Sequence, residues 1–338
     1  MKPLTRKQLT FLGAGLGLAY GLFARLTFGL GKAGDLFAVM TSSFILGVPV
    51  VLGFLTVWLG EYRQNYSWGR RILMPWGPSL MCLVCCLTLA WEGLICVFLW
   101  LPLVLVLSSF GGLLAGLARR IFTTDRTKTY CLAVVALAPF LAAPLETLRT
   151  DAAEVREVHT QIDIWASRAT VWGQIKSVPL ITEAEQRDDF IHWLGFPRPL
   201  EARLEGEGVG AVRYATFERG VLFIETITTW DEGNRLAFTI HADSKNIPPT
   251  TFDEHVTIGG PYFDVLDGTY WMEALGGGRM RLHLSSRQRL STGFNFYSHL
   301  WTEYLMARLQ NYILNVIRIR CEMIDSRLRA SANDAARA

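Results

Sequence analysis

The chain has 338 residues, and its charge is divided unevenly at about residue 150. Residues 1–150 carry 13 Lys or Arg and 5 Asp or Glu, whereas residues 151–338 carry 20 and 25, with all six histidines. Because the second part is mildly acidic and has no concentrated basic stretch, the sequence argues against nucleic acid as a partner.

Long apolar runs fill residues 1–150, and about 20 such residues are needed to cross the hydrocarbon core of a bilayer. The first run contains one charge, Arg25, about one turn from its end, where a long basic side chain can extend to the lipid headgroups. The last run is short and contains Pro139 and Pro144, which membrane helices tolerate better than soluble ones. We therefore predict a membrane domain over 1–150, an α-helical bundle with five transmembrane helices at 9–30, 36–60, 72–91, 94–118 and 130–146.

Basic residues gather in alternate connections of this domain, and the positive-inside bias assigns those connections to the cytoplasm. With five spans, we expect a cytoplasmic N-terminus and a C-terminal domain outside, in a periplasm or its equivalent. The charge pattern, together with a family resemblance of the second part, implies a bacterial inner membrane. If the fifth run does not cross, that domain is cytoplasmic. The basic residues are Lys2, Arg6 and Lys7 before the first run, Arg63, Arg70 and Arg71 after the second, and Arg119, Arg120, Arg126 and Lys128 after the fourth.

The apolar domain has none of the sequence marks of a transport pathway, such as an acidic pair, an Arg-rich helix or an internal repeat. An anchor or packing platform is the simpler interpretation. The cysteine cluster at 82–86 has no His or carboxylate beside it, which argues against a metal site. We expect neither a metal nor a cofactor.

From about residue 155 the pattern changes to short alternating segments, which indicate strands. Gly276-Gly277-Gly278 lies between two of them and predicts a hairpin turn with positive φ angles. A long helix is expected over 294–329, followed by a flexible tail at 331–338. Short helical pieces are expected at 168–176 and 183–194. Strands are expected at 158–166, 199–206, 210–218, 220–230, 235–241, 252–258, 262–274 and 279–287.

The terminal helix carries one apolar stripe, because its apolar residues recur at intervals of three and four. An antiparallel sheet has one face to bury, and this stripe offers the matching surface, so the second part is expected to be α+β. The stripe consists of Leu305, Leu309, Tyr312, Val316 and Ile319.

The order of elements, with IDIWASRATVWGQI at 162–175 and FIETITTWDEGNRLAFTI at 223–240, resembles the START-like or SRPBCC superfamily. That superfamily includes proteins named for polyketide cyclase/dehydrase and lipid transport. The sequence ATVW at 169–172 is similar to the start of the family's first helix, although the usual acidic residue is absent.

The resemblance covers about residues 157–325 and implies a START-like domain over 151–330. The implied structure is a helix-grip fold, a curved antiparallel sheet around a long C-terminal helix, with a cavity for an apolar or amphipathic molecule. The resemblance implies no single chemistry, because this fold hosts binders, transporters and enzymes.

Aromatic residues near the implied cavity are the first candidates for ligand binding, because ligand sites are mostly apolar with a few placed polar groups. Ordinary core packing is the alternative for each of them. They are Tyr214, Tyr270, Trp301 and Tyr304.

Two carboxylates within predicted strands, Glu225 and Glu254, alternate with apolar residues that would face inward. A buried carboxylate is costly unless paired, so either one would be a polar anchor or an acid/base group with a raised pKa. Arg308 on the terminal helix is the candidate partner. A register shift of one residue would instead place both carboxylates in water.

The histidines give no pattern of catalysis. His241 and His283 are expected on the outer face of the sheet, whereas His192 and His299 lie in helical segments that can reach a pocket mouth. The sequence contains neither a recognisable Ser/His/Asp arrangement nor a metal-binding spacing such as HExxH.

Three functions are consistent with these observations. The first is a membrane-anchored domain that binds a hydrophobic small molecule or lipid. The second is a cyclase, dehydratase or hydrolase that uses Glu225 or a cavity tyrosine. The third is a non-catalytic interaction or sensing module. The expected partners are therefore the lipid bilayer, an apolar ligand and, for the third function, another membrane protein.

Overall fold

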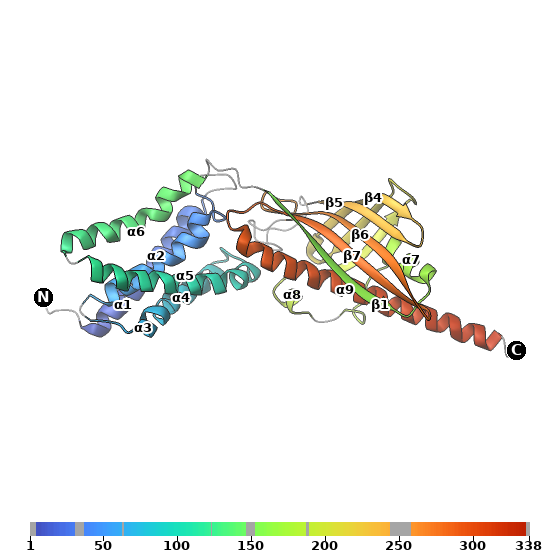
Figure 1. Cartoon of the computed structure of the whole chain (residues 1–338), viewed down its shortest axis with the longest axis horizontal. Coiled ribbons are helices and arrows are strands. Elements are labelled where there is room, and N and C mark those ends of the chain that lie inside the picture. Colours follow the sequence, from blue (N-terminus) through green and yellow to red (C-terminus); the bar gives the residue numbers. More distant parts are fainter. Residues whose placement is uncertain are drawn as a thin grey trace. The chain divides into compact units, whose positions relative to one another are not determined.

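The computed structural model describes residues 5–30, 37–62, 64–122, 124–146, 153–186, 189–243 and 258–335. The chain divides into two compact units, Met1–Ala152 with Thr292–Phe294, and Ala153–Ser291 with Asn295–Ala338. The first is helical and the second combines one sheet with helices (Figure 1). Glu254 and most of the strand expected at 252–258 lie outside the described residues.

Five helical segments of the first unit are long and apolar enough to cross a membrane: Arg6–Phe28, Ser43–Gly60, Trp68–Thr88, Leu94–Ile121 and Asp125–Glu146. The second of them begins at Ser43, seven residues later than the apolar run suggested. Its start is fixed by polar groups, because the Thr41 hydroxyl accepts from the Phe44 amide and the Glu146 carboxylate accepts from the Ser42 amide. The elements are α1 (Arg6–Phe28), η1 (Ser43–Gly47), α2 (Val48–Gly60), α3 (Trp68–Leu73), α4 (Trp76–Thr88), α5 (Leu94–Ile121) and α6 (Asp125–Glu146).

Glycines bring α1 and α5 into close contact with α2, the most buried helix of this unit. A Cβ at Gly17 would collide with the Thr56 hydroxyl, and one at Gly53 would collide with the Ser108 carbonyl. Small residues of this kind let helix backbones approach closely, which is how membrane helices associate.

Arg25 does not extend to the surface as the sequence suggested. Its side chain is buried, its Nε lies 2.6 Å from Glu92 Oε1, and its Nη2 donates to the Trp91 carbonyl at 2.6 Å. A second buried pair joins Arg71 Nε to Glu61 Oε1 at 2.7 Å. Both charges of each pair are compensated locally, so burial does not require them to reach water.

The second unit contains a seven-stranded antiparallel sheet in the order β1-β7-β6-β5-β4-β3-β2. This sheet and the long terminal helix form the helix-grip arrangement, which confirms the expected fold class (Figure 1). Gly276, Gly277 and Gly278 all have positive φ angles at the β6–β7 turn, as predicted for the hairpin. The strands are β1 (Glu154–Ile164), β2 (Pro199–Glu205), β3 (Val212–Phe217), β4 (Leu222–Asp231), β5 (Arg235–Ala242), β6 (Phe263–Gly276) and β7 (Arg279–Leu290).

The terminal helix α9 (Asn295–Ala335) packs along the sheet with a wider apolar face than the predicted stripe. Leu314, Ile317 and Cys321 belong to the core formed with the sheet and with α7 (Arg168–Lys176). In that core Trp172 meets Trp230 edge to face, with ring centroids 5.3 Å apart. The helix continues to Ala335, past the point at which we expected a flexible tail to begin.

The segment expected to be helical over 183–194 forms only the short helix α8 (Phe190–Trp193) among its described residues. Arg320 of α9 explains the difference, because its guanidinium donates to the carbonyls of Pro179 and Leu180 and pairs with Glu185 at 2.6 Å. These contacts hold residues 179–185 in a non-helical conformation, so tertiary structure overrides the local preference there.

Candidate functional site

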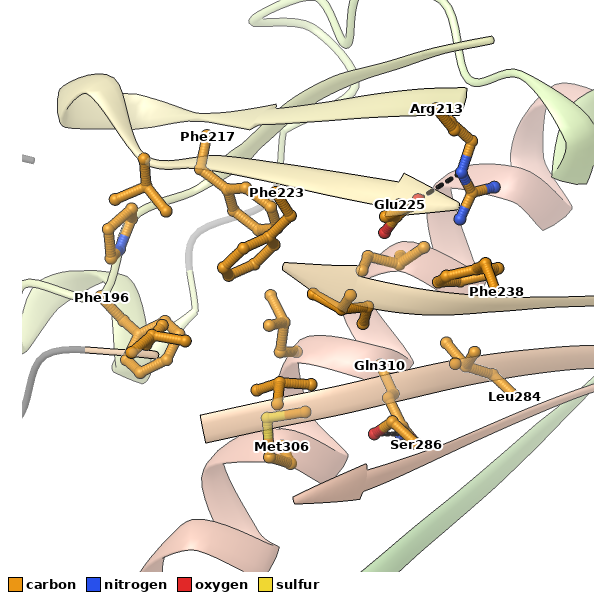
Figure 2. A pocket seen from close by; sticks show the side chains of 18 of the residues that line it. Phe196, Arg213, Phe217, Phe223, Glu225, Phe238, Leu284, Ser286, Met306 and Gln310 are labelled. Atoms are coloured by element: carbon orange, nitrogen blue, oxygen red, sulfur yellow. Dashed lines mark hydrogen bonds and ion pairs between the residues drawn. The ribbon is translucent and has the colours of Figure 1, made fainter. Parts of the chain in front are cut away.

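A cavity of about 100 Å³ lies between the inner face of the sheet and α9. Figure 2 shows three aromatic side chains, Phe196, Phe217 and Phe223, at one end and an ion pair at the other. The lining is mostly apolar with a few polar groups, which is the usual character of a small-molecule site. The polar lining groups are Arg213, Glu225, Tyr270, Ser286 and Gln310.

Arg213 of β3 and Glu225 of β4 form the ion pair, and both are buried. They face each other directly across the β3–β4 ladder, so strand register alone brings them together. Arg213 also donates through Nη1 to the Ile175 carbonyl at 2.6 Å, and its guanidinium carbon lies 4.3 Å from the centre of the Phe238 ring. The guanidinium is therefore held on several sides.

The electrostatics of the pair set the properties of this end of the cavity. Burial raises the pKa of Glu225, and the adjacent Arg213 opposes that shift. Burial also raises the pKa of Tyr270 to about 12, so its hydroxyl stays protonated at neutral pH. The guanidinium is always charged, and its hydrogen bond to the carboxylate favours the ionised pair, whose two charges cancel.

A second polar group of the cavity is built by β7 and α9. Gln310 Nε2 donates to Ser286 Oγ at 2.7 Å and to the Val158 carbonyl at 3.1 Å. Gln310 Oε1 accepts from the Thr160 hydroxyl at 2.8 Å. These bonds fix the amide orientation and the position of the serine oxygen, so the group is a rigid part of the wall.

Two positions in the wall retain hydrogen-bonding capacity. Glu225 bonds to Arg213 through Oε2, and its Oε1 bonds to none of the described residues. Ser286 accepts from Gln310, and its hydroxyl proton has no acceptor among the described residues. At these two positions the cavity offers an acceptor at Glu225 and a donor at Ser286 to a guest molecule.

Of the predicted site residues that the structure describes, some line the cavity and others do not. Glu225 and Tyr270 both line the cavity. Tyr214 lies on the other face of β3, where the Arg203 guanidinium is 5.9 Å from the centre of its ring. Trp301 and Tyr304 of α9 pack edge to face with each other outside the lining.

The expected pairing of Glu225 with Arg308 is wrong. Arg308 Nη2 instead lies 2.8 Å from Asp189 Oδ2, next to α8. The partner of Glu225 that the sequence reasoning missed is Arg213. The register of the β3–β4 hairpin, whose connection is short, could have indicated it. Alternation along β3 places Arg213 on the inner face and the neighbouring Tyr214 on the outer one.

The histidines in the described part of the chain lie away from the cavity lining. His283 is on the outer face as expected, but it is only 8% exposed because it stacks with Trp271 at a centroid distance of 4.6 Å. His192 is buried against Tyr312, 5.0 Å between ring centroids. His241 is exposed, and His299 is half-buried.

Comparisons with known proteins give structural similarities at low identity. No family model matches the chain, and no curated protein matches it. Among solved structures, the Zhui aromatase/cyclase from a Streptomyces species is 14% identical with a TM-score of 0.33, covering 50% of this chain and 94% of that one.

Norcoclaurine synthase from Thalictrum flavum, in complex with dopamine and hydroxybenzaldehyde, is 13% identical with a TM-score of 0.30 and covers 50% and 90% of the two chains. A protein from Thermus thermophilus is 17% identical with a TM-score of 0.32 and covers 49% and 97%. Similarities at this level decide nothing about function, and the fold assignment rests on the strand order and terminal helix described above.

Proposed function

We propose that the C-terminal unit binds a compact, uncharged, largely apolar molecule in the cavity between the sheet and α9. The observation that carries this proposal is the apolar lining closed at one end by the Arg213–Glu225 pair. A binding role needs no reaction, and a fold of this kind serves binders as well as enzymes.

Charge neutrality of the cavity is the first argument for an uncharged ligand. Arg213 is already compensated by Glu225, so a ligand carboxylate would have to displace Glu225 or remain unpaired. Burying an unpaired charge costs several kcal/mol or more. A hydroxyl group, in contrast, can donate to Glu225 Oε1, and a carbonyl can accept from Ser286.

Cavity size is the second argument. Typical ligand sites have volumes of about 300–1,000 Å³, whereas this cavity has about 100 Å³. An apolar cavity of about 150 Å³ binds benzene, so a cavity of about 100 Å³ admits at most a small molecule such as a single ring. The volume therefore favours a single ring or a short branched chain over a lipid with two acyl chains.

Isothermal titration calorimetry of a 153–338 fragment tests the proposal with two probes of similar size. We expect 4-methylphenol, which is neutral at pH 7, to bind about tenfold or more tightly than anionic benzoate, because of the desolvation cost of the charge. Equal affinities, or tighter binding of benzoate, would exclude an uncharged ligand.

A matched pair of variants on β5 locates the binding. Ile240 lines the cavity and is half-buried, whereas Thr239 is exposed on the other face of the same strand. Ile240→Trp should fill the cavity and abolish 4-methylphenol binding, and Thr239→Trp should leave it unchanged. If both variants bind alike, the probe lies elsewhere.

The helical unit is proposed to lie in a bilayer, with its five long apolar segments crossing it. Large apolar side chains on its surface support this placement, among them Phe11 at 76%, Val106 at 66% and Leu141 at 65% exposure. Soluble proteins rarely expose extended apolar surface of this kind. A tethered cavity would sample membrane-dissolved ligands at high effective concentration.

The free oxygen of Glu225 supports a second candidate, an enzyme of the cyclase or dehydratase type. A buried carboxylate with a raised pKa and an open side toward a cavity is suited to general acid/base chemistry. In that case Glu225→Gln would abolish turnover of the eventual substrate while the variant remained folded. Unchanged turnover would remove Glu225 from the reaction.

A further inference from the structure

A second apolar space lies in the helical unit, as a groove between α2, α5 and α6. Its volume is about 750 Å³, and three of its described lining residues are polar, namely Ser42, Ser43 and Glu146. Along α6 the groove is lined from Cys131 to Glu146. At a rise of 1.5 Å per residue, that stretch is about 22 Å long.

The helix α6 forms one wall of this groove, and the other described elements bury little of it. Of its 22 residues, only Pro139 and Ala143 are buried. The lining residues recur at helical spacing, so they form one continuous stripe along the helix. They are Cys131, Val134, Val135, Ala138, Pro139, Ala142 and Glu146.

An acyl chain is the occupant that fits these dimensions in a bilayer. The groove is longer than one leaflet of the hydrocarbon core, which is about 15 Å, and shorter than the whole core of about 30 Å. An empty apolar space would forfeit the dispersion contacts of its walls. A transmembrane helix of a second copy, about 10 Å across, would occupy more than 750 Å³ over this length.

The two ends of the groove differ in charge, which orients the occupant. At one end the Glu146 carboxylate accepts from the Ser43 amide at 2.6 Å and carries negative charge. At the other end Lys128 lies three residues before Cys131, in line with the stripe. Lys128 Nζ is 3.7 Å from the carboxylate of Asp125, which is fully exposed.

A pair of that length with one fully exposed partner contributes little, so the Lys128 ammonium is available to another anion. We infer that the groove retains one phospholipid with an anionic headgroup, its acyl chain between α5 and α6 and its phosphate at Lys128. The inference rests on the proposed placement of this unit in a bilayer. It assigns the helical unit a lipid-binding role in addition to anchoring.

Native mass spectrometry of the full chain, released from nanodiscs of equimolar dioleoylphosphatidylglycerol and dioleoylphosphatidylcholine, tests this inference. We expect one retained lipid per chain, enriched in the anionic species. Ala138→Trp fills the groove and should lower retention about tenfold. Ala133→Trp is the matched control, because Ala133 is exposed on the same helix and does not line the groove.

The headgroup contact has its own pair of variants. Lys128→Gln should remove the preference for the anionic lipid, whereas Arg126→Gln should preserve it, because Arg126 lies off the stripe and bonds to the Tyr130 hydroxyl. Lys128→Gln changes one partly exposed side chain outside the groove lining, so it remains informative if Ala138→Trp fails to fold.

Three results would overturn the inference. The first is equal lipid retention in the wild type and Ala138→Trp. The second is an unchanged headgroup preference in Lys128→Gln. The third is a two-chain species that Ala138→Trp dissociates, which would assign the groove to a second copy. Alkaline carbonate extraction separates the two proposals: a chain released from membranes refutes the bilayer placement, whereas an integral chain without lipid refutes only the groove.

Discussion

Replacing Arg213 with methionine should destabilise the C-terminal unit by removing the partner of a buried charge. Methionine retains much of the apolar stem, so the main loss is the guanidinium that compensates Glu225. Removing one member of a buried ion pair typically costs about 3–5 kcal/mol. That is a large fraction of the roughly 5–15 kcal/mol that stabilises an ordinary domain.

The pH dependence identifies the cause. Without Arg213 to oppose it, burial alone raises the pKa of Glu225 above its unfolded value of about 4.3. Between those two pKa values the folded state binds more protons than the unfolded state, so stability falls as pH rises. The defect of Arg213→Met should therefore be largest at neutral pH and shrink as pH falls toward 5.

Urea unfolding of the 153–338 fragment, followed by circular dichroism at pH 5 and pH 7.5, measures both effects. The double variant Arg213→Met/Glu225→Leu is the control, because it removes both charges and should recover most of the lost stability. A defect in Arg213→Met that is independent of pH and persists in the double variant would refute the electrostatic explanation and indicate lost packing.

Two further predictions concern contacts away from the cavity. Hydrogen bonds from Arg320 hold the pKa of Glu185 at about 2, so Arg320→Gln should cost about 1.5–3 kcal/mol at pH 7. The ionised Glu185 stabilises the folded state, and this contribution is lost as pH falls and the carboxylate becomes protonated. In urea titrations the difference in unfolding free energy between wild type and Arg320→Gln should therefore narrow as pH falls toward 2.5; a difference that stays constant would contradict this. In the helical unit, Gly17→Ala should lower the melting temperature in detergent, because the new Cβ meets Thr56. In Gly15→Ala the new Cβ meets no atom, so the melting temperature should rise or stay unchanged. Equal changes in melting temperature for the two variants would show that the close approach of α1 to α2 is unimportant.

The order of elements in the C-terminal unit could be predicted from the sequence, because it depends on local periodicity. Alternation with a period of two marked the described strands to within a few residues, and three consecutive glycines marked the β6–β7 turn. The prediction of a helix over 183–194 was wrong, because the conformation near Glu185 depends on Arg320, which lies more than 100 residues away in the chain.

The candidate site was predicted only in part, because local periodicity indicates the inward face of one strand but not how two strands pair. Alternation along its strand indicated that Glu225 faces inward, whereas Tyr270 was proposed only as an aromatic residue near the implied cavity; both line it. Arg213 was missed because its role depends on the register of two strands, which a one-residue shift would change. Arg25 was misplaced because its partner, Glu92, comes from a distant turn of the chain.

Native mass spectrometry of the 153–338 fragment, followed by extraction and identification of any retained molecule, tests the central claim most directly. The proposal predicts one compact, uncharged, largely apolar molecule per chain, absent from the Ile240→Trp variant. An anionic molecule whose binding depends on Arg213 would contradict the argument from charge. A folded fragment that stays empty when offered membrane extract would contradict a binding function and favour an interaction module.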